Sequence, residues 1–156
     1  MGGGVGLMAV ADWVIAEKAA QIGTPEVTAG VVPAQITPFL VRRIGYAQAR
    51  RLAACGLRLG ANDAQRIGLV HELADGRDEL AAKGVAAVNQ ALRCAPQAVA
   101  ETKRLVRASL GERPLGPVLD QAAEMFAAAL AGEAREGIRA FVEKRRPAWS
   151  ERIEKI

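Results

Sequence analysis

The sequence predicts an α/β fold whose last third is entirely helical. Short apolar runs alternate with helical spacing between residues 7 and 70, as expected for strands and helices that share one core. From residue 78 onward the patterned segments have helical spacing, and Pro96 marks a mild boundary near the start of the last third. A chain of 156 residues is long enough for one compact domain with a core of its own.

The first half of the chain alternates short elements. Glycines and prolines separate its apolar runs, and Gly45 divides one helical stretch from the next. The predicted elements are a helix over residues 7–11, strands over 13–16 and 20–22, a loop or short strand over 30–33, and helices over 39–44 and 47–54.

The second half is dominated by alanine-rich helical patterns. Asn62 is the expected N-cap of a short helix, Pro96 opens a later helix at its first turn, and Pro147 ends the last one. The predicted elements are a helix over residues 61–67, a strand-like pair at 69–70, helices over 78–92 and 96–109, a break over 111–117, and helices over 117–130 and 135–145.

The composition excludes several classes of function. The formal net charge is +4, but with three Phe, one Tyr and two Trp the chain lacks the aromatic residues of a nucleic-acid surface, and no DNA retention is expected. No apolar run approaches a membrane span, and Met1 leads straight into glycines, so neither a membrane segment nor a secretory signal is expected. Cys55 and Cys94 have no metal-ligand spacing and are predicted to be reduced thiols of a cytoplasmic protein. His71 stands alone, so it is expected to be a surface or packed histidine, and no metal site is predicted.

A cluster of glycines, Gly2-Gly3-Gly4-Val5-Gly6-Leu7, opens the chain. The N–H groups of successive glycines approach a ligand without hindrance from a Cβ atom. At the start of a helix, unpaired N–H groups and the helix dipole favour a phosphate or an oxyanion. Further along, Glu26 follows Pro25 in a short loop. N–H donors and one carboxylate suggest enolate chemistry. The alternatives are a tight turn beside a helix and a surface or capping glutamate.

Several segments carry a second signal through their order and spacing. They are residues 2–7, Asp12, and residues 23–27, 30–33, 43–45, 61–64, 68–70 and 136–147. Together they resemble the C-terminal portion of the crotonase-fold superfamily of enoyl-CoA hydratases and isomerases, over nearly the whole chain. Within that superfamily, residues 32–39 resemble glutaconyl-CoA-type hydratases, such as the methylglutaconyl and isohexenylglutaconyl enzymes.

The resemblance implies roles for individual residues. The N–H of Gly3 would hold the thioester oxygen as it becomes an enolate, and Glu26 would act as general acid and base. Substrate contacts are implied for Gly2, Gly4, Gly6, Pro33 and Lys144. Lys144 has the alternative of a solvated helix end that complements the helix dipole. No cofactor is implied beyond the coenzyme A of the acyl-CoA thioester substrate.

The resemblance also implies an architecture. Residues 1–95 would form part of a ββα spiral core, and residues 96–156 a helical region that builds a homo-trimer or hexamer. Phe126, Leu130, Phe141 and Val142 are expected to be helix-packing residues, some of them at a subunit interface.

Two departures from the family pattern bear on the activity. Gly6 stands where two-carboxylate hydratases have a second glutamate. The segment that supplies the second oxyanion N–H and much of the CoA surface would precede Met1, so the chain is expected to be a fragment. The predicted function is a lyase that hydrates an enoyl-CoA. The alternatives are a catalytically incompetent fragment that acts only in oligomer assembly, an enoyl-CoA isomerase and, least favoured, a basic nucleic-acid binder.

Overall fold

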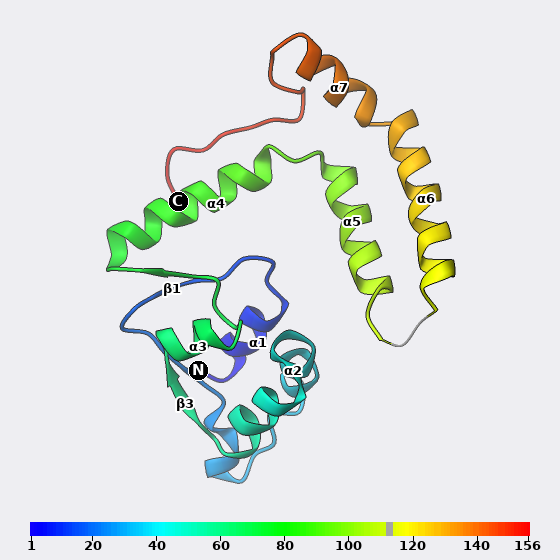
Figure 1. Ribbon diagram of the computed structural model, residues 1–156. Coiled ribbons are helices and arrows are strands. Elements are labelled where there is room, and N and C mark those ends of the chain that lie inside the picture. The colour runs from blue at the N-terminus through cyan, green and yellow to red at the C-terminus, as the bar shows by residue number, and fades with distance from the viewer. Residues whose placement is uncertain (112–113) are drawn as a thin grey trace. The chain divides into compact units, whose positions relative to one another are not determined.

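The computed structural model describes residues 1–111 and 114–156. Two compact units make up the chain, one of residues 1–87 with 155–156 and the other of residues 88–154. All the strands described belong to the first unit, and the regular structure of the second is helical (Figure 1). The α/β class and the helical last third are therefore confirmed. The division of the chain at residues 95 and 96 stays a prediction.

The first unit combines three-residue strands with helices of different lengths. Its order is α1 (Gly3–Val10), β1 (Ile15–Glu17), β2 (Gln21–Gly23), the 3₁₀ helix η1 (Pro25–Ala29), α2 (Thr37–Ala54), β3 (Arg58–Gly60), α3 (Ala61–Arg66), β4 (Glu72–Ala74) and most of α4 (Arg77–Leu92). Thus α1 begins at the glycine cluster itself, four residues before the predicted helix over residues 7–11.

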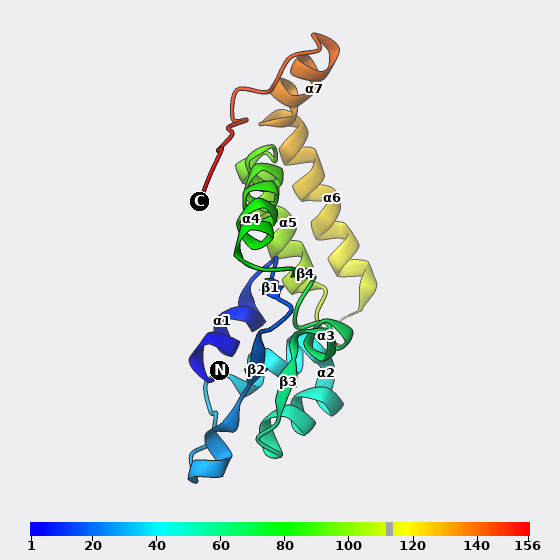
Figure 2. The same cartoon turned by 90° about the vertical axis from the view of Figure 1, so that its left-hand side faces the viewer.

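The strands form two small pairs. β1 runs parallel to β4 with Ala16 opposite Leu73, and β2 runs antiparallel to β3 with Ile22 opposite Leu59 (Figure 2). The strands predicted over residues 13–16 and 20–22 are confirmed with small shifts, whereas β3 was not predicted. The strand expected at residues 69–70 is wrong, because this buried pair lies in the loop before β4.

The core of the first unit gathers around α2. Gly45 has φ +76° and ψ +163°, so it interrupts α2 at the predicted stop between two helices. Asn62 does not cap α3, because α3 begins at Ala61 with Gly60 as its N-cap. The large side chains of this core that are fully buried are Val5, Leu40, Leu52, Leu69 and Val70.

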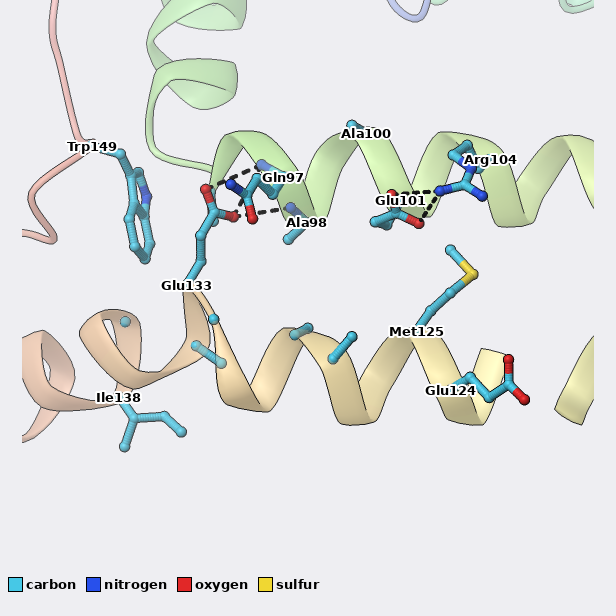
Figure 3. Close-up of a pocket in the computed structure, with 16 residues that line it drawn as sticks. Gln97, Ala98, Ala100, Glu101, Arg104, Glu124, Met125, Glu133, Ile138 and Trp149 are labelled. Atoms are coloured by element: carbon cyan, nitrogen blue, oxygen red, sulfur yellow. Dashed lines mark hydrogen bonds and ion pairs between the residues drawn. The ribbon is translucent and has the colours of Figure 1, made fainter. Parts of the chain in front are cut away.

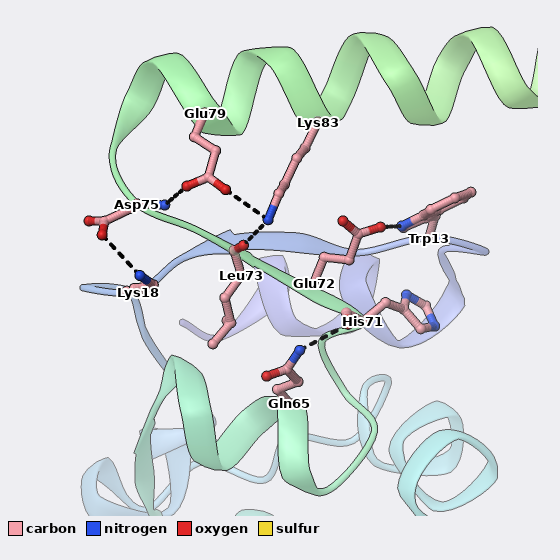
Figure 4. Close-up of polar contacts among 9 residues, drawn as sticks. All are labelled: Trp13, Lys18, Gln65, His71, Glu72, Leu73, Asp75, Glu79 and Lys83. Atoms are coloured by element: carbon pink, nitrogen blue, oxygen red, sulfur yellow. Dashed lines mark hydrogen bonds and ion pairs between the residues drawn. The ribbon is translucent and has the colours of Figure 1, made fainter.

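Polar contacts attach the start of α4 to β4 (Figure 4). The Lys83 ammonium donates to the carbonyl oxygen of Leu73 at 2.5 Å and pairs with Glu79 at 3.0 Å. The other carboxylate oxygen of Glu79 accepts from the N–H of Asp75 at 2.5 Å, and Asp75 pairs with Lys18 at 2.9 Å. β4 and the start of α4 are therefore connected by side-chain contacts in addition to the short segment of chain between them.

His71 lies just before β4 and is an exposed residue with hydrogen-bond partners, in agreement with the expected surface or packed histidine. Its Nδ1 accepts a hydrogen bond from the N–H of Val14 at 2.8 Å, and Arg43 Nη2 lies 2.9 Å from its Nε2. Partial burial, followed by the positive charge of Arg43, lowers the pKa of His71 below its ordinary value. The imidazole therefore favours its neutral form.

The second unit contains the end of α4, then α5 (Pro96–Ala108), α6 (Leu115–Ala131) and α7 (Ala134–Val142). The predicted helices over residues 78–92, 96–109 and 117–130 are confirmed. The predicted break over residues 111–117 falls partly outside the described residues. α7 ends at Val142, three residues before the end predicted from Pro147. Phe126, Leu130, Phe141 and Val142 are 68%, 45%, 84% and 73% exposed, so packing of these side chains within the chain is not found, and a position for some of them at a subunit interface stays a prediction.

Candidate functional site

The glycine cluster forms the first turn of α1. Gly2 is the N-cap, with φ +55°, and its N–H donates to the carbonyl oxygen of Gly23 at 3.0 Å. The N–H of Val5 donates back to the Gly2 carbonyl at 2.8 Å. Among the described residues, none accepts a hydrogen bond from the N–H of Gly3 or Gly4. These two donors are available to a ligand at the positive end of the helix dipole.

The space in front of these donors is open. A Cβ atom built on Gly3 or Gly4 meets no atom within 4 Å, and both residues are exposed. The glycines are therefore not required here by packing within this chain. Their lack of side chains leaves the first turn of α1 accessible to a ligand atom.

The side chain of Glu26, a residue of η1, lies beside the N-terminus of α1. Its Oε1 lies 3.2 Å from the position that a Cβ atom would take on Gly2. Its Oε2 is buried and, in the described parts of the chain, has no hydrogen-bond partner. A buried carboxylate oxygen without a donor costs free energy, and such atoms require an explanation such as a catalytic role. The predicted pair of Glu26 and the glycine cluster is thus brought together.

Close packing holds η1 in this position. Any side chain on Gly23 would clash with the carbonyl oxygen of Leu57, because β2 passes very close to the segment before β3. Thr24, which is fully buried, donates its hydroxyl to the carbonyl oxygen of Leu52 at 3.3 Å. Gly56, with φ +59°, lets the turn after α2 approach Val27, whose Cγ2 lies 3.1 Å from the position of a Cβ. Gly23 and Thr24 belong to one of the segments that carry the family resemblance, but the sequence did not predict their role in packing.

Ile36 occupies the space beside Gly6. A Cβ on Gly6 would lie 3.2 Å from Ile36 Cγ1, which is tighter than ordinary contact. The structure thus gives a local reason for glycine at this position, because a longer side chain would have to displace Ile36. Ile36 was missed at the sequence level. Its only signal there was an apolar residue between Pro33 and Pro38.

Pro33 is buried and organises the start of α2. Its carbonyl oxygen accepts from the N–H of Thr37 at 3.0 Å and from the Thr37 hydroxyl at 2.8 Å. Pro33 also lines an apolar hollow of about 340 Å³, together with Val27 and Val41. A substrate contact for Pro33 stays a prediction.

Lys144 belongs to the second unit and lies just beyond α7. It adopts φ +53°, its N–H donates to the Phe141 carbonyl at 3.2 Å, and the Arg145 N–H donates to the Ala140 carbonyl at 3.0 Å. This is the Schellman pattern of a helix C-terminus, with lysine where glycine is usual. The exposed Lys144 therefore has the position of a helix-end cation, and its contact with CoA stays a prediction.

A hollow of about 740 Å³ in the second unit lies between α5, α6 and the start of α7 (Figure 3). Glu133 projects from the α6–α7 turn, and its carboxylate accepts from the N–H groups of Gln97 and Ala98 at 3.0 Å. On α5, Glu101 pairs with Arg104 at 2.8 Å. Glu133 caps the start of α5, and the Glu101–Arg104 pair stabilises its first turns. These charged residues thus have a structural role and do not by themselves indicate a ligand.

Two further surveys cover the described parts of the chain. No group of three or more His, Cys, Asp or Glu residues is arranged there to hold a metal ion. None of the helices described has the length and apolar character needed to cross a membrane. Cys55 and Cys94 are both exposed free thiols.

Comparison with known proteins places this site in a family context. Residues 1–152 match the sequence pattern of the family described as enoyl-CoA hydratase/isomerase. The chain is 36% identical to a mevalonyl-coenzyme A hydratase of Aspergillus fumigatus over 156 residues, which is 96% of this chain and 56% of that protein. It is 32% identical to a 2,3-dehydroadipyl-CoA hydratase of Escherichia coli, covering 97% of this chain and 60% of that enzyme.

Solved structures give the same picture. An enoyl-CoA hydratase/isomerase from Marinobacter aquaeolei superposes with a TM-score of 0.90 at 49% identity, covering 97% of this chain and 57% of that one. Pseudomonas aeruginosa AtuE superposes with a TM-score of 0.89 at 48% identity, covering 96% and 58%. The chain thus spans a little over half the length of the relatives that it matches.

Proposed function

The chain belongs to the enoyl-CoA hydratase/isomerase family, and we propose that its first unit carries the acid–base half of a site that adds water to an enoyl-CoA thioester. One observation carries this proposal. The buried, unpartnered carboxylate oxygen of Glu26 lies beside the first turn of α1, where the Gly3 N–H has no acceptor among the described residues.

The proposed reaction uses these two groups in sequence. The thioester oxygen accepts a hydrogen bond from the Gly3 N–H, which stabilises negative charge on that oxygen. Glu26 removes a proton from water as the water oxygen bonds to the β-carbon, and the electrons of the C=C bond move to form the enolate. Glu26 then returns the proton to the α-carbon. Atoms and charge balance as the addition of one water molecule.

The assignment to one carboxylate follows from Gly6. Since Ile36 fills the space beside Gly6, no second carboxylate is provided from that position of α1. Glu26 therefore acts as both base and acid in the proposal. Isomerisation would use the same pair of groups, but the relatives from Aspergillus fumigatus and Escherichia coli compared above carry hydratase names, which favours hydration.

The remaining features of the proposal concern partners and location. Gly2, Gly4, Gly6, Pro33 and Lys144 are proposed to contact the acyl-CoA substrate, and no cofactor is proposed beyond its coenzyme A. Exposed apolar side chains on α6, among them Leu119 and Phe126, support a homo-trimer or hexamer. The free thiols of Cys55 and Cys94 support a cytoplasmic location.

The test is hydration of a short enoyl-CoA by the 156-residue chain, followed by loss of the conjugated thioester absorbance. Glu26→Gln keeps the shape of the side chain but cannot accept the proton, so kcat should fall by roughly 10²–10⁴-fold. Glu17→Gln, which changes a carboxylate at the end of β1, is the matched control and should keep the activity.

Two outcomes would contradict the proposal. Full activity in Glu26→Gln would remove the assigned acid and base. Absence of turnover by the unaltered chain, together with a large particle in sedimentation, would favour the alternative of a fragment that acts only in oligomer assembly.

A further inference from the structure

Arg43, a half-buried residue of α2, contacts three other segments of the first unit through its guanidinium group. Its Nη1 donates to the carbonyl oxygen of Ala11 at 3.1 Å, and its Nε donates to the carbonyl oxygen of Gly68 at 3.1 Å. Its Nη2 lies 2.9 Å from Nε2 of His71. Ala11 is the C-cap of α1, Gly68 follows α3, and His71 precedes β4.

The contact with Ala11 is favourable because of its place at a helix end. The last carbonyl groups of a helix have no partner within it and carry its negative partial charge, so a guanidinium group is well placed there. The planar guanidinium of Arg43 donates in several fixed directions at once, which the single ammonium of a lysine does not reproduce.

α1 depends on such contacts because it is short and only partly covered. Of its eight residues, all described by the structure, Val5 alone is buried, and the others are half-buried or exposed. Just before the helix, the Gly2 N–H donates to the carbonyl oxygen of Gly23 at 3.0 Å. Arg43 supplies the polar contact at the opposite end, on Ala11.

The axis of α1 determines the direction of the proposed oxyanion donor. N–H groups in the first turn of a helix point along its axis, so a tilt of α1 redirects the Gly3 N–H. Glu26 is positioned separately, because Gly23 and Thr24 place η1 against the chain at Leu57 and Leu52. A tilt therefore alters the geometry between donor and carboxylate, and a misplacement of about 1 Å can cost about 10²-fold in rate.

His71 extends this attachment to the chain that follows α1. Its Nδ1 accepts from the N–H of Val14 at 2.8 Å, and its carbonyl oxygen accepts from the side-chain amide of Gln65 at 3.1 Å (Figure 4). Two charged side chains act on the ring, Arg43 from α2 and Glu72 from β4. The ring thus lies between the segment after α1 and the guanidinium that contacts the end of α1.

Protonation of His71 would weaken both of these contacts. A proton on Nδ1 removes the acceptor that the Val14 N–H uses, and the imidazolium then carries the same charge as Arg43. Burial and the charge of Arg43 hold the pKa of His71 below its ordinary value of 6.5, so the ring is neutral at neutral pH. The attachment of α1 is therefore complete at neutral pH and weaker in acid.

We propose that Arg43 is a positioning residue for the reaction at Glu26, and that it holds α1 and the Gly3 N–H through contacts to Ala11 and His71 that protonation of His71 weakens. Arg43 acts through α1 and not on the substrate. The inference rests on the proposed function, because the position of α1 affects the rate only if Gly3 is the donor.

The first test is steady-state hydration of a short enoyl-CoA at neutral pH. Arg43→Lys keeps the charge but not the several directed contacts, so kcat should fall by roughly 10–100-fold. KM should change little, because the Gly3 donor acts on charge that develops in the transition state. Arg42→Lys, at the exposed neighbouring position of α2, is the matched control and should keep kcat.

His71→Asn supplies a readout in the pH profile. The side-chain oxygen of asparagine can accept from the Val14 N–H as Nδ1 does, but asparagine does not ionise. In the unaltered chain kcat should fall as the pH decreases through the pKa of His71, whereas the variant should keep its kcat over that interval. A residue that only supports folding would not change the pH profile of the folded molecules.

Nuclear magnetic resonance gives a readout that does not require turnover. The chain has one histidine, so the ring signals of His71 are assigned directly and report its pKa. In the unaltered chain the amide signals of α1 should shift with that same pKa. In Arg43→Lys these amides should exchange with solvent roughly tenfold faster, while those of α5 in the second unit stay unchanged.

Three outcomes would overturn the proposal. They are a kcat of Arg43→Lys equal to that of Arg42→Lys, a pH profile of His71→Asn equal to that of the unaltered chain, and α1 amides that do not follow the titration of His71. Far-UV circular dichroism establishes that each variant is folded, and His71→Asn carries the test if Arg43→Lys is not. If the unaltered chain does not hydrate the enoyl-CoA, the proposed function fails, and the amide signals still decide whether Arg43 and His71 hold α1.

Discussion

At the scale of single residues, Glu26 and Gly3 differ in what the fold requires of them. A polar group that is buried without a partner typically costs about 1–3 kcal/mol, and the unpartnered Oε2 of Glu26 is in that position. Gly3 has the opposite character, because it is exposed and nothing lies near its missing side chain. Its proposed contribution is the backbone N–H alone, and this can be tested without altering the packing.

Substitutions at Gly3 can remove the N–H or retain it. Gly3 is the first residue of α1, a position at which proline is well accommodated because no N–H is needed within the helix. Gly3→Pro should therefore leave α1 folded while lowering kcat by about 10²–10³-fold, the usual effect of losing an oxyanion donor. Steady-state kinetics on an enoyl-CoA provide the measurement.

Gly3→Ala is the matched variant for this prediction. It keeps the N–H, and its methyl group enters open space, so its kcat should stay within a few-fold of the unaltered chain. Equal losses in the two variants would show that the backbone donor is not what matters at this position.

At the scale of elements, the β2–β3 pair determines where η1 and its glutamate lie. Gly23 ends β2 in such close contact with the Leu57 carbonyl that no side chain fits, and η1 begins two residues later. The opposing backbone is fixed by its ladder partner, since Gly23 is opposite Arg58. A substitution that displaces Gly23 from this contact should therefore change both the stability of the first unit and the position of Glu26.

Gly23→Ala should destabilise the first unit by about 1–3 kcal/mol, as overpacking against a rigid backbone usually does. Gly60→Ala is the control in the same ladder. A Cβ on Gly60 meets nothing within 4 Å and its φ is −68°, so this change should cost less than Gly23→Ala, through the weaker N-cap preference of alanine alone. Denaturant unfolding measures both, and similar stability of the two variants would contradict the tight contact at Gly23.

At the scale of the whole molecule, two units with different internal contacts share one chain. The first has a core of buried aliphatic side chains around α2, whereas the helices of the second expose several apolar residues and are joined partly by polar contacts. One such contact is the Arg145–Glu136 pair after α7. Because this pair belongs to the second unit alone, its response to pH should appear in the unfolding of that unit.

The sign of this response follows from Glu136. Hydrogen bonds from Arg145 first, and then from the Ala148 N–H, lower the pKa of Glu136 from 4.5 to about 2. A carboxylate whose pKa is lower in the folded state stabilises that state above the unfolded value, and the stabilisation is lost as protonation proceeds. The melting temperature of the second unit should therefore fall between pH 4.5 and about pH 2.

Glu136→Gln provides the comparison, since it cannot ionise and should show a shallower decline over this pH interval. Thermal unfolding followed by circular dichroism at several pH values is the measurement. The same slope in the variant and in the unaltered chain would assign the acid sensitivity to other groups.

The limits of prediction from sequence are visible in particular residues. The stop at Gly45 and the helix start at Pro96 were predictable, since a glycine with positive φ and a proline in the first turn act through local backbone geometry. β3 and the loop at residues 69–70 were not, because each strand described has only three residues and its pairing joins distant segments. The predicted cap at Asn62 was wrong because Gly60 is the N-cap of α3, so that Asn62 lies inside the first turn.

The sequence by itself determined the family, the helical last third, and the pairing of a glycine cluster with Glu26, because these depend on residue type, order and spacing. Only the tertiary structure decided that Glu26 has an unpartnered buried oxygen, that Ile36 fills the space beside Gly6, and that Gly23 lies too close to the Leu57 carbonyl to carry a side chain. The physical reason is that burial, close contact and charge pairing depend on residues far apart in the chain, and these distances exist only once the chain has folded.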